Sequence, residues 1–172
     1  MTKMLTCRYA DIHKMNVSDG PGIGVSLYLQ GCPFHCPGCF NESTWDFEGG
    51  RPYTTEVMYQ IADLVKQPYV SRLSILGGEP LLERNYRALC NTIDVCKANN
   101  KRLKAWLWTG RLWEDVTKEA EQDFNELPCL LRKLDYIVDG PFIQEQKDLT
   151  LKFRGSSNQR IIALNGNEEI GY

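Results

Sequence analysis

Four apolar runs in this sequence end in the same way, with small or reactive residues placed directly after a strand-like segment. Val, Ile, Leu and Trp dominate the runs, as is typical of buried strands, and glycine marks where each one stops. The four are residues 23–30 before Gly31-Cys32, residues 72–76 before Gly77-Gly78-Glu79, residues 103–108 before Thr109-Gly110, and residues 134–138 before Asp139-Gly140. Because the carboxyl ends of parallel strands meet at one edge of a sheet, the pattern predicts a single shared site there.

Helical periodicity separates these strands. Apolar residues recur at helical spacing over 54–66, 82–98 and 112–127, with Thr54 as the predicted N-cap of the first helix and Pro128 ending the third. Residues 151–154 and 160–164 are weaker strand candidates. The chain has 172 residues, whereas a complete eight-stranded barrel needs about 250. We therefore expect an α/β fold, a partial, open (βα) barrel of about four to six mostly parallel strands, with residues 1–172 forming one domain.

Three cysteines follow the first predicted strand in a C-x3-C-x2-C pattern. Cys32, Cys36 and Cys39 lie in the segment Gly-Cys-Pro-Phe-His-Cys-Pro-Gly-Cys-Phe at 31–40. Thiolates at such short spacings can bind one metal centre. A structural zinc ion and a fully ligated four-iron cluster both take four protein ligands. Three ligands in one loop therefore favour a [4Fe–4S] cluster with one iron open to a substrate or cofactor.

Two other interpretations of these cysteines remain open. The Cys-Pro-Gly-Cys run at 36–39 alone fits a redox dithiol, which does not need Cys32. A zinc site would need a fourth ligand, and His35 or a distant cysteine could supply it.

The remaining cysteines show no ligand spacing. Cys90 and Cys96 fall on the apolar face of the second predicted helix, so we expect them in the core. Cys7 and Cys129 are isolated, and the sequence assigns them no role.

The composition narrows the class of protein. The 20 basic and 22 acidic residues give a formal net charge of -2, which offers no argument for nucleic-acid binding. We expect no membrane span, since no apolar run reaches about 18 residues, and no signal peptide. Seven cysteines without a secretion signal indicate a reducing compartment, so we expect a cytoplasmic protein.

The Gly-Gly-Glu-Pro run at 77–80 is a candidate ligand site, although it also fits a tight turn. Glycines let a backbone approach a ligand closely. We expect exposed N–H groups at Gly77 and Gly78 to bind a carboxylate, and Glu79 to accept a hydrogen bond from an ammonium group. Such a site would suit an amino-acid zwitterion, for example the methionine part of S-adenosylmethionine.

Together these motifs resemble those of the radical S-adenosylmethionine enzymes, in which the cysteine pattern is paired with Gly-Gly-Glu-Pro. Further motifs narrow the resemblance to activases of glycyl-radical enzymes: Asp-Gly-Pro-Gly at 19–22, Gln-Gly-Cys at 30–32, and Asn41 with Thr44-Trp45. The runs at 106–110, 138–142 and 154–159 are similar to those of the subgroup that activates anaerobic (class III) ribonucleoside-triphosphate reductase. The resemblance covers residues 15–162.

Two positions depart from the pattern of those families. Gly24 stands where relatives often carry arginine after Asp-Gly-Pro-Gly-Ile. Gly38 stands where many relatives have an aromatic residue before the third cysteine, and Phe40 follows that cysteine instead. Phe40 is therefore the candidate to lie near the adenine.

The resemblance implies the cofactors and their ligands. Cys32, Cys36 and Cys39 would bind three irons of a [4Fe–4S] cluster, and S-adenosylmethionine would chelate the fourth. It implies that the cofactor site comprises Gly38, Cys39, Phe40, Gly77, Gly78, Glu79 and Thr109.

The resemblance also implies the reaction and its partners. Reductive cleavage of S-adenosylmethionine would give a 5′-deoxyadenosyl radical, which would abstract a hydrogen from a glycine of anaerobic ribonucleotide reductase and leave a glycyl radical. The protein substrate would be that reductase, and the electron would come from a flavodoxin-type or other low-potential reductant.

Alternatives within and outside this superfamily remain open. One is a radical enzyme acting on a small molecule, such as one resembling the deazaguanine ring-contraction synthase. Another is an activase for a different glycyl-radical enzyme, such as pyruvate formate-lyase. A third is a non-catalytic iron–sulfur or zinc protein serving electron transfer or regulation.

Overall fold

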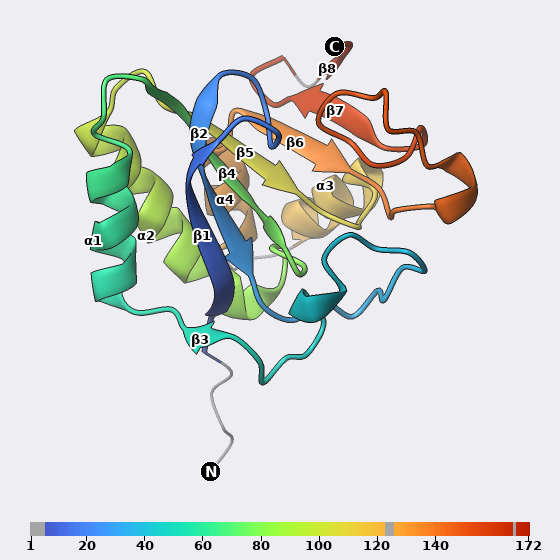
Figure 1. Ribbon diagram of the computed structural model, residues 1–172, viewed down its shortest axis with the longest axis horizontal. Coiled ribbons are helices and arrows are strands. Elements are labelled where there is room, and N and C mark those ends of the chain that lie inside the picture. The colour runs from blue at the N-terminus through green and yellow to red at the C-terminus, as the bar shows by residue number, and fades with distance from the viewer. Residues whose placement is uncertain (1–5, 123–125, 167) are drawn as a thin grey trace.

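Eight strands form one mixed sheet within residues 6–122, 126–166 and 168–172, which the computed structural model describes (Figure 1). Its spatial order is β3-β1-β2-β4-β5-β6-β7-β8. The strands are β1 (Arg8–Asn16), β2 (Ile23–Leu29), β3 (Arg51–Pro52), β4 (Val70–Gly77), β5 (Lys104–Trp108), β6 (Tyr136–Asp139), β7 (Arg160–Ala163) and β8 (Glu168–Ile170). The helices are α1 (Thr55–Leu64), α2 (Glu83–Asn99), α3 (Trp113–Gln122) and α4 (Leu127–Lys133), with short 3-10 helices η1 (Glu42–Thr44) and η2 (Gln144–Gln146).

One face of this sheet packs against the helices. Leu27 of β2 and Ile75 of β4 point to this face and form one buried cluster with Ile61 of α1 and Ile93 of α2. All four side chains are fully buried, and each such burial contributes roughly 1.5–3 kcal/mol. Because side chains alternate along a strand, the residues between them face the opposite side of the sheet, where the pocket described below lies.

The α/β class is confirmed, but the prediction of four to six mostly parallel strands is wrong. The four central strands, β2, β4, β5 and β6, are parallel to one another. The outer pairings, β1 with β2 and β3, and β7 with β6 and β8, are antiparallel. Strand β1 escaped prediction because Asp11, His13 and Lys14 are exposed along it and break the apolar pattern. Its pairing with β2 and β3 defines it.

The individual elements follow the predictions with two corrections. Thr54 is the N-cap of α1, and its side chain accepts a hydrogen bond from Val57 N. The third predicted helix corresponds to α3 as far as Gln122. Pro128 does not end a helix as predicted: it lies in the first turn of a further helix, α4, a position that suits its missing N–H. The end of that predicted helix partly falls on residues 123–125, which lie outside the described residues. Residues 151–154 form a loop instead of a strand, whereas β7 confirms the strand predicted at 160–164.

Candidate active site

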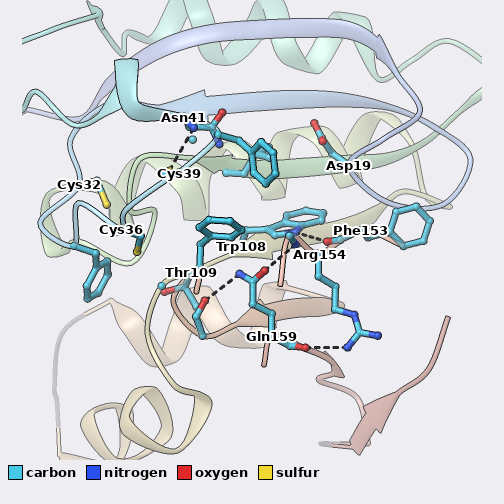
Figure 2. A pocket seen from close by; sticks show the side chains of 18 of the residues that line it. Asp19, Cys32, Cys36, Cys39, Asn41, Trp108, Thr109, Phe153, Arg154 and Gln159 are labelled. Atoms are coloured by element: carbon cyan, nitrogen blue, oxygen red, sulfur yellow. Dashed lines mark hydrogen bonds between the residues drawn. The ribbon is translucent and has the colours of Figure 1, made fainter. Parts of the chain in front are cut away.

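A pocket of about 470 Å³ opens at the carboxyl ends of the four parallel strands (Figure 2). The residues that follow these strands line it together: Cys32 after β2, Gly78 and Glu79 after β4, Thr109 and Gly110 after β5, and Gly140 after β6. The four strand ends therefore line one pocket, as the sequence predicts. Cofactor sites commonly have volumes of about 300–1,000 Å³, so the pocket is large enough for a nucleoside-sized cofactor.

Backbone hydrogen bonds hold the cysteine loop against the end of β2. Gly31 N donates to Thr44 O at 2.7 Å, and Cys32 N donates to Trp45 O at 3.1 Å. The Gln30 side chain donates to two further carbonyls of the same loop. Gly31 has a φ of +98°, which glycine adopts without strain. The chain can therefore turn sharply out of the strand into its first cysteine.

Cys32, Cys36 and Cys39 are half-buried, and all three line the pocket. Asn41 N donates to Cys39 Sγ at 3.3 Å. Burial raises the pKa of the Cys32 thiol, while two backbone N–H groups of its own loop act in the opposite direction. N–H···S hydrogen bonds favour the thiolate, which is the form that binds iron.

The three thiols line one pocket but do not converge on a single ion. Across the part of the chain that the structure describes, no three His, Cys, Asp or Glu side chains are grouped so that they could hold a metal ion. In a four-iron cluster each cysteine binds a different iron, so the three sulfurs surround a cluster and need not meet at one ion. His35, the alternative zinc ligand, is exposed, and its ring stacks on Trp45 with the centroids 4.5 Å apart. Cys32, Cys36 and Cys39 are thus the residues that would hold the cluster.

Gly78 of the Gly-Gly-Glu run has a different role from the one predicted. Gly78 N donates to Leu29 O, and Glu79 N donates to Gly31 O, each at 2.8 Å. The Gly78 N–H is therefore already used and is not the exposed carboxylate donor that the sequence suggested, whereas that role for Gly77 stays a prediction. A Cβ at Gly78 would lie 2.3 Å from Gly31 O. The glycine allows the end of β4 to approach the chain just before Cys32.

Glu79 is also more deeply engaged than predicted. Its side chain is 1% exposed. One carboxylate oxygen accepts from Leu81 N at 2.8 Å and from Thr109 Oγ1 at 2.7 Å, and the other accepts from Gly110 N at 2.8 Å. Burial raises the pKa of Glu79, and these three hydrogen bonds oppose that effect. Glu79 thereby ties the end of β4 to the end of β5, with Thr109 as a partner, and a role toward an ammonium group stays a prediction.

We expect Glu79→Ala to lower the free energy of unfolding by about 3 kcal/mol or more, because three buried donors would lose their acceptor. Urea unfolding of the apoprotein would measure this, with the exposed Glu83→Ala as a matched control. Glu79→Gln keeps one acceptor oxygen and should lose less. If Glu79→Ala left the unfolding free energy unchanged, the carboxylate would serve the cofactor alone.

Phe40 and Gly38 occupy different positions relative to the pocket. Phe40 lines it, is 60% exposed and meets Phe142 edge-on with centroids 5.4 Å apart. It remains the candidate to contact the adenine. Gly38 has a φ of +74° and packs against Gln144 and Phe142, where any Cβ would collide with the Gln144 side chain. Its contribution to the cofactor site is therefore to let the cysteine loop approach the β6–β7 loop.

Sequence reasoning missed the aromatic wall of the pocket. Trp108 and Phe153 line it, and Trp108 Nε1 donates to Phe153 O at 2.8 Å. The position of Trp108 could have been predicted from the sequence, because this residue directly precedes Thr109 at the end of a predicted strand. Phe153 was assigned to a strand that does not exist, so its position in the pocket was not foreseen.

The run at 154–159 is internally bonded. Gln159 Oε1 accepts from Gly155 N at 2.9 Å, and Gln159 Nε2 donates to Gly140 O at 3.0 Å. Arg154 Nη1 donates to Gln159 O at 2.9 Å. The segment is therefore a structural turn, but Arg154, Gly155 and Gln159 also line the pocket (Figure 2).

The remaining cysteines lie away from this site. Cys90 and Cys96 are buried in the core between the sheet and the helices, as predicted. All seven cysteines are free thiols.

Comparison with known proteins first defines the class. Residues 18–162 match the family described as "4Fe-4S single cluster domain". This range covers the pocket and the three cysteines that line it, so the chain belongs to that class of iron–sulfur proteins.

Curated relatives then specify the family. An anaerobic ribonucleoside-triphosphate reductase-activating protein of Vibrio cholerae serotype O1 is 35% identical over 89% of this chain and 96% of its own length. The protein of the same description from Enterobacteria phage T4 is 34% identical over 89% of this chain and 92% of its own. The one from Escherichia coli (strain K12) is 31% identical over 88% and 95%. The chain belongs to the family of anaerobic ribonucleoside-triphosphate reductase-activating proteins, whose cofactors are a [4Fe–4S] cluster and S-adenosylmethionine.

Proposed function

We propose that this protein activates an anaerobic ribonucleoside-triphosphate reductase by generating a glycyl radical on it. The observation that carries the proposal is that Cys32, Cys36 and Cys39 line one pocket with the ends of β4, β5 and β6. The names of the relatives support the reductase as the partner, in preference to a small molecule or pyruvate formate-lyase.

When bound, the cluster and S-adenosylmethionine would supply the radical chemistry, that is, reductive cleavage of the sulfonium and removal of a hydrogen atom from glycine. The residues of this chain position the reacting groups. The three cysteines hold the cluster, Glu79 and Thr109 fix the floor of the pocket, and Phe40 with Trp108 provides apolar walls that limit access of water.

The shape of the site suits a macromolecular substrate. The loop after β2 and the loop between β6 and β7 meet beside the pocket at Phe40 and Phe142, although two strands separate β2 from β6 in the sheet. This convergence supports a sheet that curves into a partial, open barrel around its parallel strands. Leu149 at the pocket is 79% exposed, so the mouth is accessible to a loop of a larger protein.

Anaerobic mixing with the reductase of the same organism, S-adenosylmethionine and dithionite should produce the electron paramagnetic resonance doublet of a glycyl radical on the larger protein. If the glycines of the reductase are deuterated, deuterium should appear in 5′-deoxyadenosine, because the hydrogen moves directly to the 5′ carbon. Omission of S-adenosylmethionine is the control. Cofactor cleavage that never yields a glycyl radical would contradict the proposal and favour a small-molecule substrate.

The physiological electron source is proposed to be a flavodoxin-type or other low-potential reductant, and the site of action the reducing cytoplasm. Seven free thiols support a reducing compartment. In the described residues, no helix has both the length and the apolar character needed to cross a membrane.

A further inference from the structure

A fully buried arginine lies beneath one wall of the pocket. Arg72 of β4 is 1% exposed and pairs in register with Gly24 of β2. Its side chain lies across Gly24 and Gly20. A Cβ on Gly24 would be 2.4 Å from Arg72 Cγ and 2.3 Å from Nη1, and a Cβ on Gly20 would be 2.8 Å from Cδ. The two glycines thus leave the space that the arginine fills.

The guanidinium group binds the loop that joins β1 to β2. Nη2 donates to Asn16 O at 2.7 Å, and Nε donates to Pro21 O at 3.2 Å. Nη1 donates at 2.8 Å to Ser74 Oγ, which in turn donates to Asp19 O at 2.5 Å. One planar group therefore holds three carbonyls of the loop, two directly and one through serine. A lysine ammonium could not reproduce this fork of donors.

The same loop presents a carboxylate to the pocket. Asp19 lines the pocket, and Tyr28 Oη donates to its Oδ2 at 2.8 Å. The backbone N–H groups of Ser18 and Asp19 donate to Asn16 Oδ1, which also accepts from Arg72 Nη2. Figure 2 shows Asp19 on the side of the pocket away from Thr109. Arg72 therefore fixes the backbone of Asp19 through two intermediates, Asn16 Oδ1 and Ser74 Oγ, and so fixes the position of its carboxylate.

We propose that Arg72 is a positioning residue for hydrogen transfer, acting by fixing the loop at 16–22 and the Asp19 carboxylate within it. This inference rests on the proposed function, since it concerns how the pocket uses its radical. Arg72 reaches the pocket only through this loop and lies at the opposite end of β4 from the cysteine loop. Its loss should therefore disturb the pocket wall without removing the cluster.

The first test is hydrogen exchange of the loop amides in the full-length reconstituted protein without a partner. Arg72→Met keeps most of the side-chain volume but removes every donor. Exchange at Ser18 and Asp19 should accelerate on the order of tenfold or more, because local opening no longer breaks the arginine contacts. Arg87→Met, at an exposed arginine that pairs with Glu126, is the matched control and should leave these amides unchanged.

The second test is the yield of glycyl radical per S-adenosylmethionine cleaved, with iron content measured in parallel. Arg72→Met should keep its iron but lose this yield on the order of tenfold or more, since small displacements at a reacting centre are costly. The radical yield of Arg72→Lys should lie between that of the wild-type protein and that of Arg72→Met.

Exchanging the two residues provides the decisive variant. In the double variant Gly24→Arg/Arg72→Gly, the arginine side chain extends from β2 on the same face of the sheet as Arg72 does in the wild-type protein. It can enter the space that the Arg72 side chain no longer fills. Gly24→Arg alone should clash with Arg72. The exchanged pair should recover loop protection and radical yield relative to either single variant. The proposal is wrong if the double variant folds but its yield of glycyl radical per S-adenosylmethionine cleaved stays as low as that of Arg72→Gly. It is also wrong if Arg72→Met keeps the wild-type radical yield and the wild-type hydrogen-exchange rates of the loop amides.

Failure of the proposed function would be recognised separately. If wild-type protein forms no glycyl radical with the reductase, the proposed function is wrong. Hydrogen exchange of the amides in the loop at 16–22 still tests the role of Arg72, because it needs no reductase. Unchanged exchange in Arg72→Met would then refute the positioning role by itself.

Discussion

Alanine at Cys32, Cys36 or Cys39 should abolish both the cluster and reductase activation. Anaerobically reconstituted wild-type protein should contain about four irons per chain. Each single variant should lose most of this iron, because two thiolates in one loop cannot retain a cluster whose fourth iron is already without a protein ligand. All three cysteines line the same pocket, and a backbone N–H group donates to the sulfur of Cys39. Iron and sulfide analysis with electron paramagnetic resonance of the reduced protein would measure the loss.

Cys96→Ala is the matched control for these variants. Cys96 is fully buried on α2, within the core and outside the pocket. The same substitution there should keep the cluster and lower the free energy of unfolding by about 1 kcal/mol, as expected for a small cavity. If Cys96→Ala removed the cluster while Cys32→Ala retained it, the ligand assignment would be wrong.

Valine at position 78 should cause a loss of similar size by a different route. Its Cβ would lie 2.3 Å from Gly31 O and 2.9 Å from Gly31 C, and backbone atoms cannot move away as a flexible side chain can. The end of β4 would have to separate from the residue that precedes Cys32, which breaks the hydrogen bond from Glu79 N to Gly31 O. We therefore expect Gly78→Val to lose more than half of its iron as well as its affinity for S-adenosylmethionine.

The sequence alone leads to a different expectation. If Gly78 lay beside the ligand, its replacement by valine would weaken cofactor binding without loss of iron. Iron analysis and isothermal titration on the same preparation would separate the two. Gly171→Val is the control, since a Cβ there meets no atom within 4 Å. Gly78→Val protein that keeps its full iron but binds S-adenosylmethionine weakly would restore the original interpretation.

Much of the fold could be predicted because its signals are local. The strands at 23–30, 72–76, 103–108 and 134–138 are rich in apolar residues, and the helices between them have clear periodicity. Strands β1 and β8 could not be predicted in this way. They are polar, so no alternation of apolar residues marks them, and their strand conformation depends on pairing with more apolar neighbouring strands, β2 for β1 and β7 for β8.

For the site, the sequence by itself determined the chemistry: three cysteines in one loop, and four strand ends that meet at one edge. Only the tertiary structure decided what the neighbouring residues do. In the sequence, Gly78 and Glu79 resemble groups that bind a ligand. In the structure, Glu79 N donates to Gly31 O, the Glu79 side chain accepts from Thr109, and Gly78 N donates to Leu29 O. Gly24 departs from the pattern of related activases, and the structure places Arg72 of the adjacent strand in the space beside it. Such roles depend on which backbones approach within van der Waals contact, and strand register sets that distance.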